Sequence, residues 1–189
     1  MSDITIRPYR LDDVPQINYI EATVQPYLPE HRHVLPAMYE RALSAMRVGD
    51  YRWVSMGGPT PGPEKETHLA FWVAEAAGGQ LVGTVGAYPV RLDHTMPLGM
   101  GLVQEWRSRH DVALLDRLRV MPEARRQRVA WRLNEAVIEW CRTHGYRTLV
   151  LNTTPPQIPA VALYRSMGFR EEFHSFVGRY ELIWFVLDL

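Results

Sequence analysis

The sequence predicts a mixed α/β domain, and three observations lead to that prediction. The chain has 189 residues, the usual size of one domain, so residues 1–189 are expected to form a single domain. Hydrophobic residues make up 47% of it and charged residues 22%, a balance typical of a packed core rather than of disorder. Strand-like apolar runs alternate along the chain with stretches of helical spacing, which indicates a sheet with helices packed against it.

Each element is predicted from its apolar period and from the turn residues beside it. Strands are expected at residues 4–7, 69–75, 80–88, 112–120, 148–151, 173–177 and 181–187. Helices are expected at residues 11–22, 35–48, 125–141 and 160–167, with Asp12 or Asp13 capping the first of them. Ala77-Gly78-Gly79 is typical of a hairpin turn, whereas residues 57–64 and 91–111 have no steady period and are expected to be loops.

The charge and cysteine content exclude several classes of partner. Twenty-one basic residues balance twenty-one acidic ones, whereas a nucleic-acid-binding protein would normally carry a basic excess. The single cysteine, Cys141, cannot form an internal disulfide and is expected to be a packing residue. The sequence has neither the apolar core of a signal peptide nor the roughly 20 apolar residues of a membrane span. We therefore expect a cytoplasmic protein with no nucleic-acid or membrane partner.

The strongest chemical signal lies where the strand at 112–120 runs into the helix expected from Arg125. The N–H groups that begin such a helix have no partner in a preceding turn, and with the helix dipole they form an anion site suited to a pyrophosphate. Arg125, Arg126 and Arg128 would add charge-assisted donors beside it. Cations are disfavoured in a first helical turn by about 0.3–1 kcal/mol each. Their clustering therefore favours a phosphate site over a merely solvated helix face.

Two motifs in this half of the chain resemble those of one family. Leu118-Arg119-Val120-Met121-Pro122, followed by residues 125–130, is similar to motif A of the GNAT superfamily of acyl-CoA N-acyltransferases. That motif is a strand ending in Val-x-Pro and then Arg/Gln-x-x-Gly-x-Gly/Ala. Residues 160–169, with Tyr164 and Gly168-Phe169 at the family's spacing, resemble its motif B. The first strand and the hairpin also match, so the similarity covers most of the chain.

The resemblance implies a fold, a cosubstrate and a reaction. The fold is a mixed, largely antiparallel central sheet flanked by helices, in which parallel strands 4 and 5, here residues 112–120 and 148–151, splay apart. The acyl donor is acetyl-CoA, and a primary amine of a small molecule or peptide attacks the thioester directly. No metal is expected, because the sequence completes no four-ligand set at a familiar spacing. The implied cofactor-binding residues are Leu118, Arg119, Val120, Arg125, Arg126, Gln127, Arg128, Val129, Ala130, Gln157 and Tyr164. Backbone groups of Leu118 and Val120 would pair with the pantetheine arm like an added strand.

Two positions depart from the family's pattern. Arg128 stands where a Gly is usual in the pyrophosphate loop, and its side chain would either clash with the phosphate or point away and donate a further charge. Gln157 stands where motif B commonly has an Asn, and it keeps the amide on a longer arm.

Tyr164 matches the family's acid tyrosine. A phenol with a pKa of about 10 stays protonated at neutral pH and can donate its proton to a departing thiolate. The alternative is a tyrosine that anchors its helix on the sheet.

The general base is harder to assign. Many relatives place a Glu early in the fourth strand, where this chain has Ala113 and Leu114. Asp116, expected on the same strand face as Leu114 and Leu118, is the first candidate, and a carboxylate paired with Arg117 is the alternative. Other candidates are Glu105, His110, Asp111 and a water chain.

Acceptor identity is not encoded in any motif. Recognition would involve residues 19–39, residues 91–111, where Trp106 could line a pocket, and the last hairpin. The apolar run at 182–187 suits either a homodimer interface or burial within one chain. Two other functions stay open: a catalytically degenerate relative that binds acyl-CoA as a regulatory module, and an interaction domain without a cofactor.

Overall fold

The computed structural model describes residues 3–24, 70–90, 101–177 and 180–189. The described elements are β1 (Thr5–Pro8), η1 (Leu11–Asp13), α1 (Val14–Thr23), β2 (Ala70–Glu75), β3 (Leu81–Pro89), α3 (Gly101–Ser108), β4 (Val112–Val120), η5 (Pro122–Ala124), α4 (Val129–Thr143), β5 (Thr148–Thr153), α5 (Ile158–Ser166), β6 (Arg170–Val177) and β7 (Tyr180–Asp188). The helix expected at 35–48, the loop at 57–64 and most of the acceptor segment at 19–39 lie outside the described residues.

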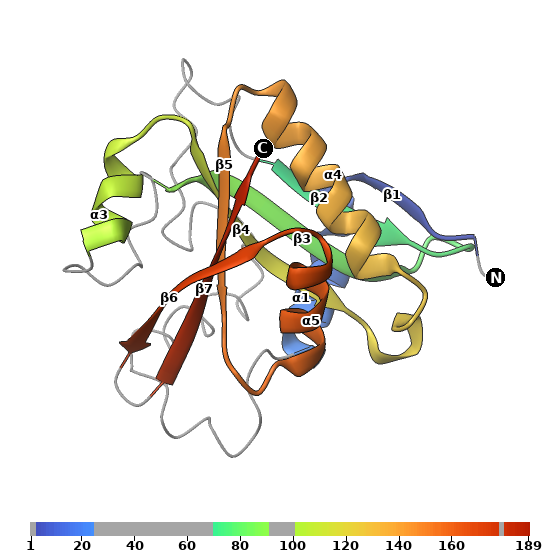
Figure 1. Cartoon of the computed structure of the whole chain (residues 1–189). Helices are drawn as coiled ribbons and strands as arrows, with labels where there is room; N and C mark the ends of the chain where they lie inside the picture. Colours follow the sequence, from blue (N-terminus) through green and yellow to red (C-terminus); the bar gives the residue numbers. More distant parts are fainter. Residues whose placement is uncertain (1–2, 25–69, 91–100, 178–179) are drawn as a thin grey trace.

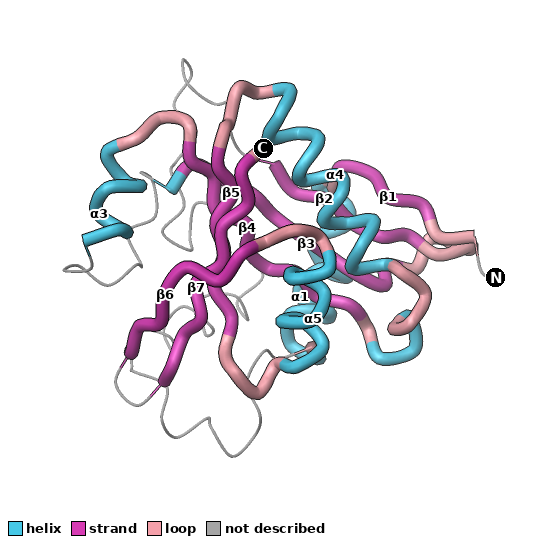
Figure 2. Tube along the Cα trace, viewed as in Figure 1, coloured by secondary structure: helices cyan, strands magenta, loops and turns pink. Residues whose placement is uncertain are grey.

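One sheet of seven strands, in the order β1-β2-β3-β4-β5-β7-β6, organises these elements (Figure 1). Every neighbouring pair is antiparallel except β4 and β5, which run parallel. The β4–β5 pairing starts at Val112 with Thr148 and ends at Leu114 with Val150, so β5 does not accompany the rest of β4. The predicted fold class, with its largely antiparallel sheet and splayed fourth and fifth strands, is confirmed (Figure 2).

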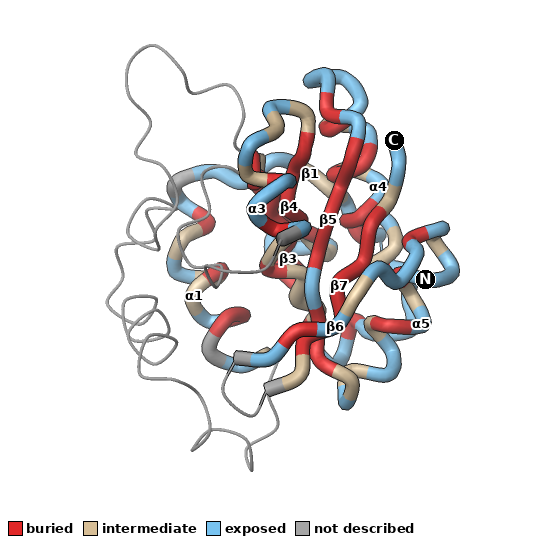
Figure 3. Tube along the Cα trace, turned by 60° about the vertical axis from the view of Figure 1, so that its left-hand side comes forward, coloured by how far each residue is buried: buried red, intermediate tan, exposed pale blue. Residues whose placement is uncertain are grey.

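Helices α1 and α4 cover opposite sides of the sheet (Figures 1 and 3). Helix α4 turns an apolar stripe toward β1–β4, in which Val129, Leu133, Val137 and Cys141 are buried, as its 3.6-residue period predicts. Burial raises the pKa of the Cys141 thiol to about 12, so Cys141 is an inert packing residue. Strands β5 and β7 are buried along most of their length (Figure 3).

Gly83 sets how closely β3, β4 and α4 approach one another. A Cβ at this position would lie 2.9 Å from the carbonyl oxygen of Arg119 and 3.1 Å from Cδ1 of Leu133. We expect Gly83→Ala to lower the free energy of unfolding by about 1–3 kcal/mol, because the tightest contact is with backbone that cannot rotate away. Urea unfolding would measure the loss. An unchanged midpoint would contradict this account of the packing, and a compensating Leu133→Val change should rescue little.

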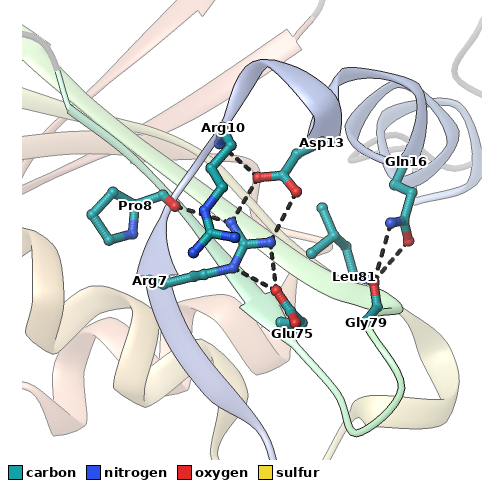
Figure 4. A network of polar contacts seen from close by, with 8 residues as sticks. All are labelled: Arg7, Pro8, Arg10, Asp13, Gln16, Glu75, Gly79 and Leu81. Atoms are coloured by element: carbon teal, nitrogen blue, oxygen red, sulfur yellow. Dashed lines mark hydrogen bonds and ion pairs between the residues drawn. The ribbon is translucent and has the colours of Figure 1, made fainter.

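A polar network ties β1 to the start of α1 (Figure 4). The guanidinium of Arg7 donates to both carboxylate oxygens of Asp13, at 2.7 and 2.9 Å, and also binds Glu75 of β2. The Arg10 N–H donates to the same carboxylate at 2.6 Å. Asp13 thus occupies the N-cap position of α1, as expected, but its side chain makes no capping bond to the helix. The Arg7 hydrogen bonds hold its carboxylate instead and lower its pKa.

Gln16 connects the same helix to the hairpin between β2 and β3. Its side-chain amide donates to the Gly79 carbonyl at 3.2 Å and accepts from the Leu81 N–H at 2.9 Å (Figure 4). Gly78 and Gly79 both have positive φ, so the predicted hairpin turn requires glycine at these positions.

The expectation of an irregular loop across 91–111 is wrong for its second part. Residues Gly101–Ser108 form helix α3, which buries Val103 and Trp106. The Trp106 ring lies 5.7 Å from that of Phe173 and 5.8 Å from that of Trp184. Trp106 is therefore part of a second, smaller core rather than the lining of an acceptor pocket. The helix has only two turns, too short for a sequence period to stand out.

The run at 182–187 is explained by burial within one chain, since Leu182, Trp184 and Val186 lie in this second core while Ile183 and Phe185 lie in the main one. None of the described helices combines the length and the apolar character that a membrane crossing requires.

Candidate functional site

The site is built around the part of β4 that β5 leaves unpaired. The backbone groups of Arg119 and Met121 point toward β3. The Met121 N–H donates to the Val82 carbonyl at 2.9 Å, and Arg119 pairs with Thr84. Backbone groups alternate along a strand, so those of Leu118 and Val120 point away from β3. Among the described strands, none pairs with β4 in this direction beyond Leu114. The geometry thus leaves the two residues expected to bind an extended ligand on an edge without a strand partner, here called the free edge. The Leu118 carbonyl accepts from the Arg119 Nη1 at 3.0 Å and the Val120 carbonyl from the Arg125 Nε at 3.4 Å, and each oxygen keeps a second lone pair for a ligand.

A bulge at Arg117 separates this edge from the paired part of β4. Arg117 has a φ of 58°, and the β3–β4 register shifts between Thr84 and Gly86. The Thr84 hydroxyl donates to the Arg117 carbonyl at 3.0 Å, and the Arg117 N–H donates to Asp116 Oδ1 at 2.7 Å. These bonds satisfy the backbone groups that the extra residue takes out of the ladder.

Asp116 lies at the bulge, and this corrects its expected environment. The simple alternation that placed it with Leu114 and Leu118 is interrupted at Arg117. Its carboxylate binds the Arg117 N–H and lies 3.6 Å from the Arg117 Nε, which is the paired arrangement weighed as the alternative. The side chain remains partly exposed, so the pairing does not remove it from solvent.

The loop after β4 differs from the continuous helix expected from Arg125. Arg125 is extended, Arg126 has a φ of 62° and Arg128 a φ of 61°, so α4 begins only at Val129. The expectation that the arginines occupy the first turn of this helix is therefore wrong. The first bond into α4 runs from the Arg132 N–H to the Arg128 carbonyl.

The start of α4 nevertheless keeps the features of an anion site. The N–H groups of Val129, Ala130 and Trp131 have no acceptor one turn earlier in the helix. Two left-handed residues just before them turn the chain tightly, a conformation that lets successive N–H groups converge. Gln127 lies between these two residues, and its side-chain amide donates to the Glu123 carbonyl at 3.0 Å.

The Arg128 side chain lies along α4, where its guanidinium sits 5.3 Å from the centre of the Trp131 ring. The guanidinium thus lies against a side chain of the first turn of α4.

A matched pair of variants tests whether the loop acts through its backbone. Arg128→Gly preserves the left-handed conformation, and we expect the Kd for CoA to change less than about threefold. Arg128→Val opposes that conformation, because a β-branched residue is strained at positive φ, and we expect at least a tenfold higher Kd. Calorimetric titration with CoA would measure both. Equal weakening by the two changes would assign the binding to the guanidinium instead.

Tyr164 lies on α5, buried against the sheet. Its ring packs 5.7 Å from that of Phe169 and 5.9 Å from that of Phe185, so it does anchor the helix. Burial is the main cause of a pKa raised well above the usual value for tyrosine, opposed by the Arg119 charge and assisted by that of Asp116. Tyr164 is thus a protonated phenol at neutral pH, and the anchoring role is compatible with the acid role.

The other residues predicted for the site lie outside the segment formed by β4 and the loop that follows it. Gln157 precedes α5 and donates to the Thr154 hydroxyl at 3.4 Å. The Asp111 carboxylate accepts from the Nε and Nη2 of Arg109, at 2.9 and 3.1 Å, and these hydrogen bonds lower its pKa. Glu105 and His110 are exposed. Within the described ranges no three His, Cys, Asp or Glu side chains gather as a metal site would require.

One buried acid at the site has no counterpart in the motifs. Glu21 of α1 lies against β4, 3.5 Å from the Arg119 Nε. No sequence pattern distinguishes it from other helix residues, because its role depends on a strand almost a hundred residues further along the chain.

A sheet in which two parallel strands part beside a tight loop and a helix start defines the acyl-CoA N-acyltransferase fold. An acetyltransferase of the GNAT family from Staphylococcus aureus superposes with a TM-score of 0.65 at 16% identity, over 98% of this chain and 99% of that one. The structure of yncA from Salmonella typhimurium, solved with its cofactor acetyl-CoA, gives a TM-score of 0.61 at 14% identity, over 99% and 94%. These likenesses concern the fold.

Sequence comparison leads to the family. The model of the acetyltransferase (GNAT) family matches residues 35–169, and the chain belongs to that family. Among curated proteins, mouse N-acetyltransferase 8 is 43% identical over 107 residues, which is 57% of this chain and 41% of the relative. Human N-acetyltransferase 8 is 39% identical over 111 residues, 59% of this chain and 43% of the relative. The matched segment spans less than half of these relatives.

Proposed function

We propose that this chain transfers the acetyl group of acetyl-CoA to a primary amine of a small molecule or peptide, within a single domain. The observation that carries the proposal is the continuity of two binding features: the free edge at Leu118 and Val120 leads through the left-handed loop directly to the start of α4. Membership of the family, relatives named N-acetyltransferases and a structural neighbour solved with acetyl-CoA support it.

The residues present fit the chemical parts of acetyl-CoA. The pantetheine arm carries amides, which the backbone groups of Leu118 and Val120 would pair with as an added strand does. The pyrophosphate is an anion, which the N–H groups of Val129, Ala130 and Trp131 would receive, with Arg125 and Arg126 beside them. A thioester is an electrophile toward amines, so the donor supplies an activated acetyl group and the protein supplies its placement.

The reaction proceeds in this proposal by direct attack of the neutral amine on the thioester carbonyl. The new C–N bond forms as the C–S bond breaks, and the amine nitrogen gives up one proton. Tyr164 donates its phenolic proton to the departing sulfur, so that CoA leaves as the free thiol. The proton released by the amine passes through Asp116 or water and restores the phenol. Asp116 is suited to this route because its carboxylate is partly exposed beside the bulge.

A second function rests on Arg128 and Asp116. With glycine absent from the loop and the carboxylate bound to Arg117, the same surface would serve a relative that binds acyl-CoA as a regulatory module without turnover.

One assay separates the two functions. The chain is incubated with acetyl-CoA and a panel of primary amines, and free thiol is followed over time while CoA affinity is measured by titration. Amine-dependent thiol release supports the transferase. Saturable CoA binding with no turnover on any amine would support the regulatory module, and the lack of both would favour an interaction domain without a cofactor. A true binder at a hundredfold over its Kd should gain roughly 2.7 kcal/mol of stability, which a thermal shift would detect.

A further inference from the structure

A buried carboxylate that the proposed reaction does not use lies where α1 meets β4. Glu21 is only 5% exposed, and its Oε2 lies 3.5 Å from the Arg119 Nε and 3.8 Å from the Arg117 Nη1. Within the part of the chain that the structure describes, the Glu21 Oε1 and the Arg119 Nε have no hydrogen-bond partner. A buried charge cluster with unsatisfied atoms contributes little net stability, so stabilisation alone does not account for it.

The two arginines that Glu21 contacts are the neighbours of Leu118 on either side. Arg119 reaches back along the strand, where its Nη1 donates to the Leu118 carbonyl at 3.0 Å. Arg117 forms the bulge, whose carbonyl is held by Thr84. A single carboxylate on α1 thus contacts both residues that determine where Leu118 lies, at the free edge of β4.

The local charge balance argues against an ionic ligand for this cluster. Glu21 and Asp116 carry two negative charges, and Arg117 and Arg119 carry two positive ones, all linked by contacts of 3.5–3.8 Å. The four charges cancel, so the cluster has no net attraction for a further anion or cation. Its geometry is instead suited to holding one segment of backbone.

We propose that Glu21 is a positioning residue through which α1 holds the Leu118 edge of β4 in the geometry that receives the acyl donor. The inference rests on the proposed function, since it concerns the binding of the same donor. It adds a residue outside both motifs, on a helix that the motifs do not include.

The test is calorimetric titration of the full chain with CoA. Glu21→Gln keeps the shape of the side chain and removes its charge, and we expect about a tenfold higher Kd. The KM for acetyl-CoA should rise with it, while kcat at saturating donor stays within about twofold. In an Arg119→Gln background the same change should cost less than twofold, because Glu21 would act through the arginine it holds.

Glu75→Gln is the matched control, since Glu75 is a part-buried glutamate that binds Arg7 at the β1–β2 edge of the sheet, away from the Leu118 edge of β4. It should lower the melting temperature without changing the Kd. If Glu21→Gln fails to fold, Glu21→Asp keeps the charge with a shorter reach and should weaken CoA binding by a smaller factor.

The outcomes separate the two proposals. An unchanged Kd in a folded Glu21 variant, or equal weakening by Glu75→Gln, would overturn this inference while leaving the transferase in place. Failure of the unmodified chain to bind CoA at all would overturn the proposed function and this inference with it.

Discussion

Tyr164→Phe is expected to lower kcat for amine acetylation by about 100-fold or more, since positioned acids contribute about 10²–10⁴-fold. The substitution removes one hydroxyl and keeps the ring that packs against Phe169 and Phe185. Without a proton donor the sulfur must leave as a thiolate into a buried environment, which raises the barrier. The KM for acetyl-CoA should stay within about twofold. Thiol release measured at saturating donor and amine gives the comparison.

Tyr146→Phe is the control for this experiment. Tyr146 is also a buried tyrosine, but it follows α4 and stacks on Trp140, with 5.5 Å between ring centres. Its variant should keep kcat within about twofold. If Tyr164→Phe also leaves kcat unchanged, Tyr164 is only an anchor for α5, and the acid must be sought elsewhere or the regulatory module preferred.

The fold was largely predictable because its signals are local. The hairpin was marked by a glycine pair that supplies positive φ, and α4 by an apolar stripe with a helical period. The parting of β4 and β5 followed only from the resemblance to the GNAT family. Helix α3 was missed because two turns give too few apolar repeats, and Trp106 alone does not indicate which side is buried.

The sequence patterns predict which residues form the site, but they do not predict the backbone conformation of those residues. Sequence patterns do not show a left-handed residue unless it is glycine, and Arg117, Arg126 and Arg128 all have positive φ. The bulge at Arg117 consequently changed the environment expected for Asp116. The role of Glu21 could not be predicted from its own segment, because its partners, Arg117 and Arg119, belong to a strand far along the chain.

The arginines around the start of α4 also show that sequence patterns do not reveal which side chains are already paired. Arg125, Arg126 and Arg128 predicted an anion site, yet most of the arginines between residues 117 and 132 already have partners within the protein. Arg117 and Arg119 lie against Glu21, Arg125 donates to the Val120 carbonyl, Arg128 lies over Trp131 and Arg132 donates to the Ile4 carbonyl. The prediction of an anion site now depends chiefly on the backbone at the start of α4 rather than on the number of arginines.

Asp13→Asn is expected to lower the free energy of unfolding by about 3 kcal/mol at neutral pH, because it leaves a nearly buried arginine without its main partner. The Asp13 and Arg7 side chains are 8% and 16% exposed, and two hydrogen bonds join them. The loss should also depend on pH. Arg7 lowers the pKa of Asp13 in the folded state, so the contribution is complete above the unfolded value of about 4 and is lost as the pH falls through the folded value. Unfolding in urea at several pH values would measure it.

The difference between the original chain and Asp13→Asn should therefore be constant above about pH 5 and shrink toward acid pH, as protonation of Asp13 weakens the same pair in the original chain. Asp188→Asn provides the control. Asp188 binds Arg170 at the surface, where the two side chains are 72% and 54% exposed, so solvent screens their attraction and the change should stay within about 0.5 kcal/mol. Equal losses for the two variants, or an Asp13 difference that persists at acid pH, would show that the pair at β1 and α1 acts through packing rather than through its charge.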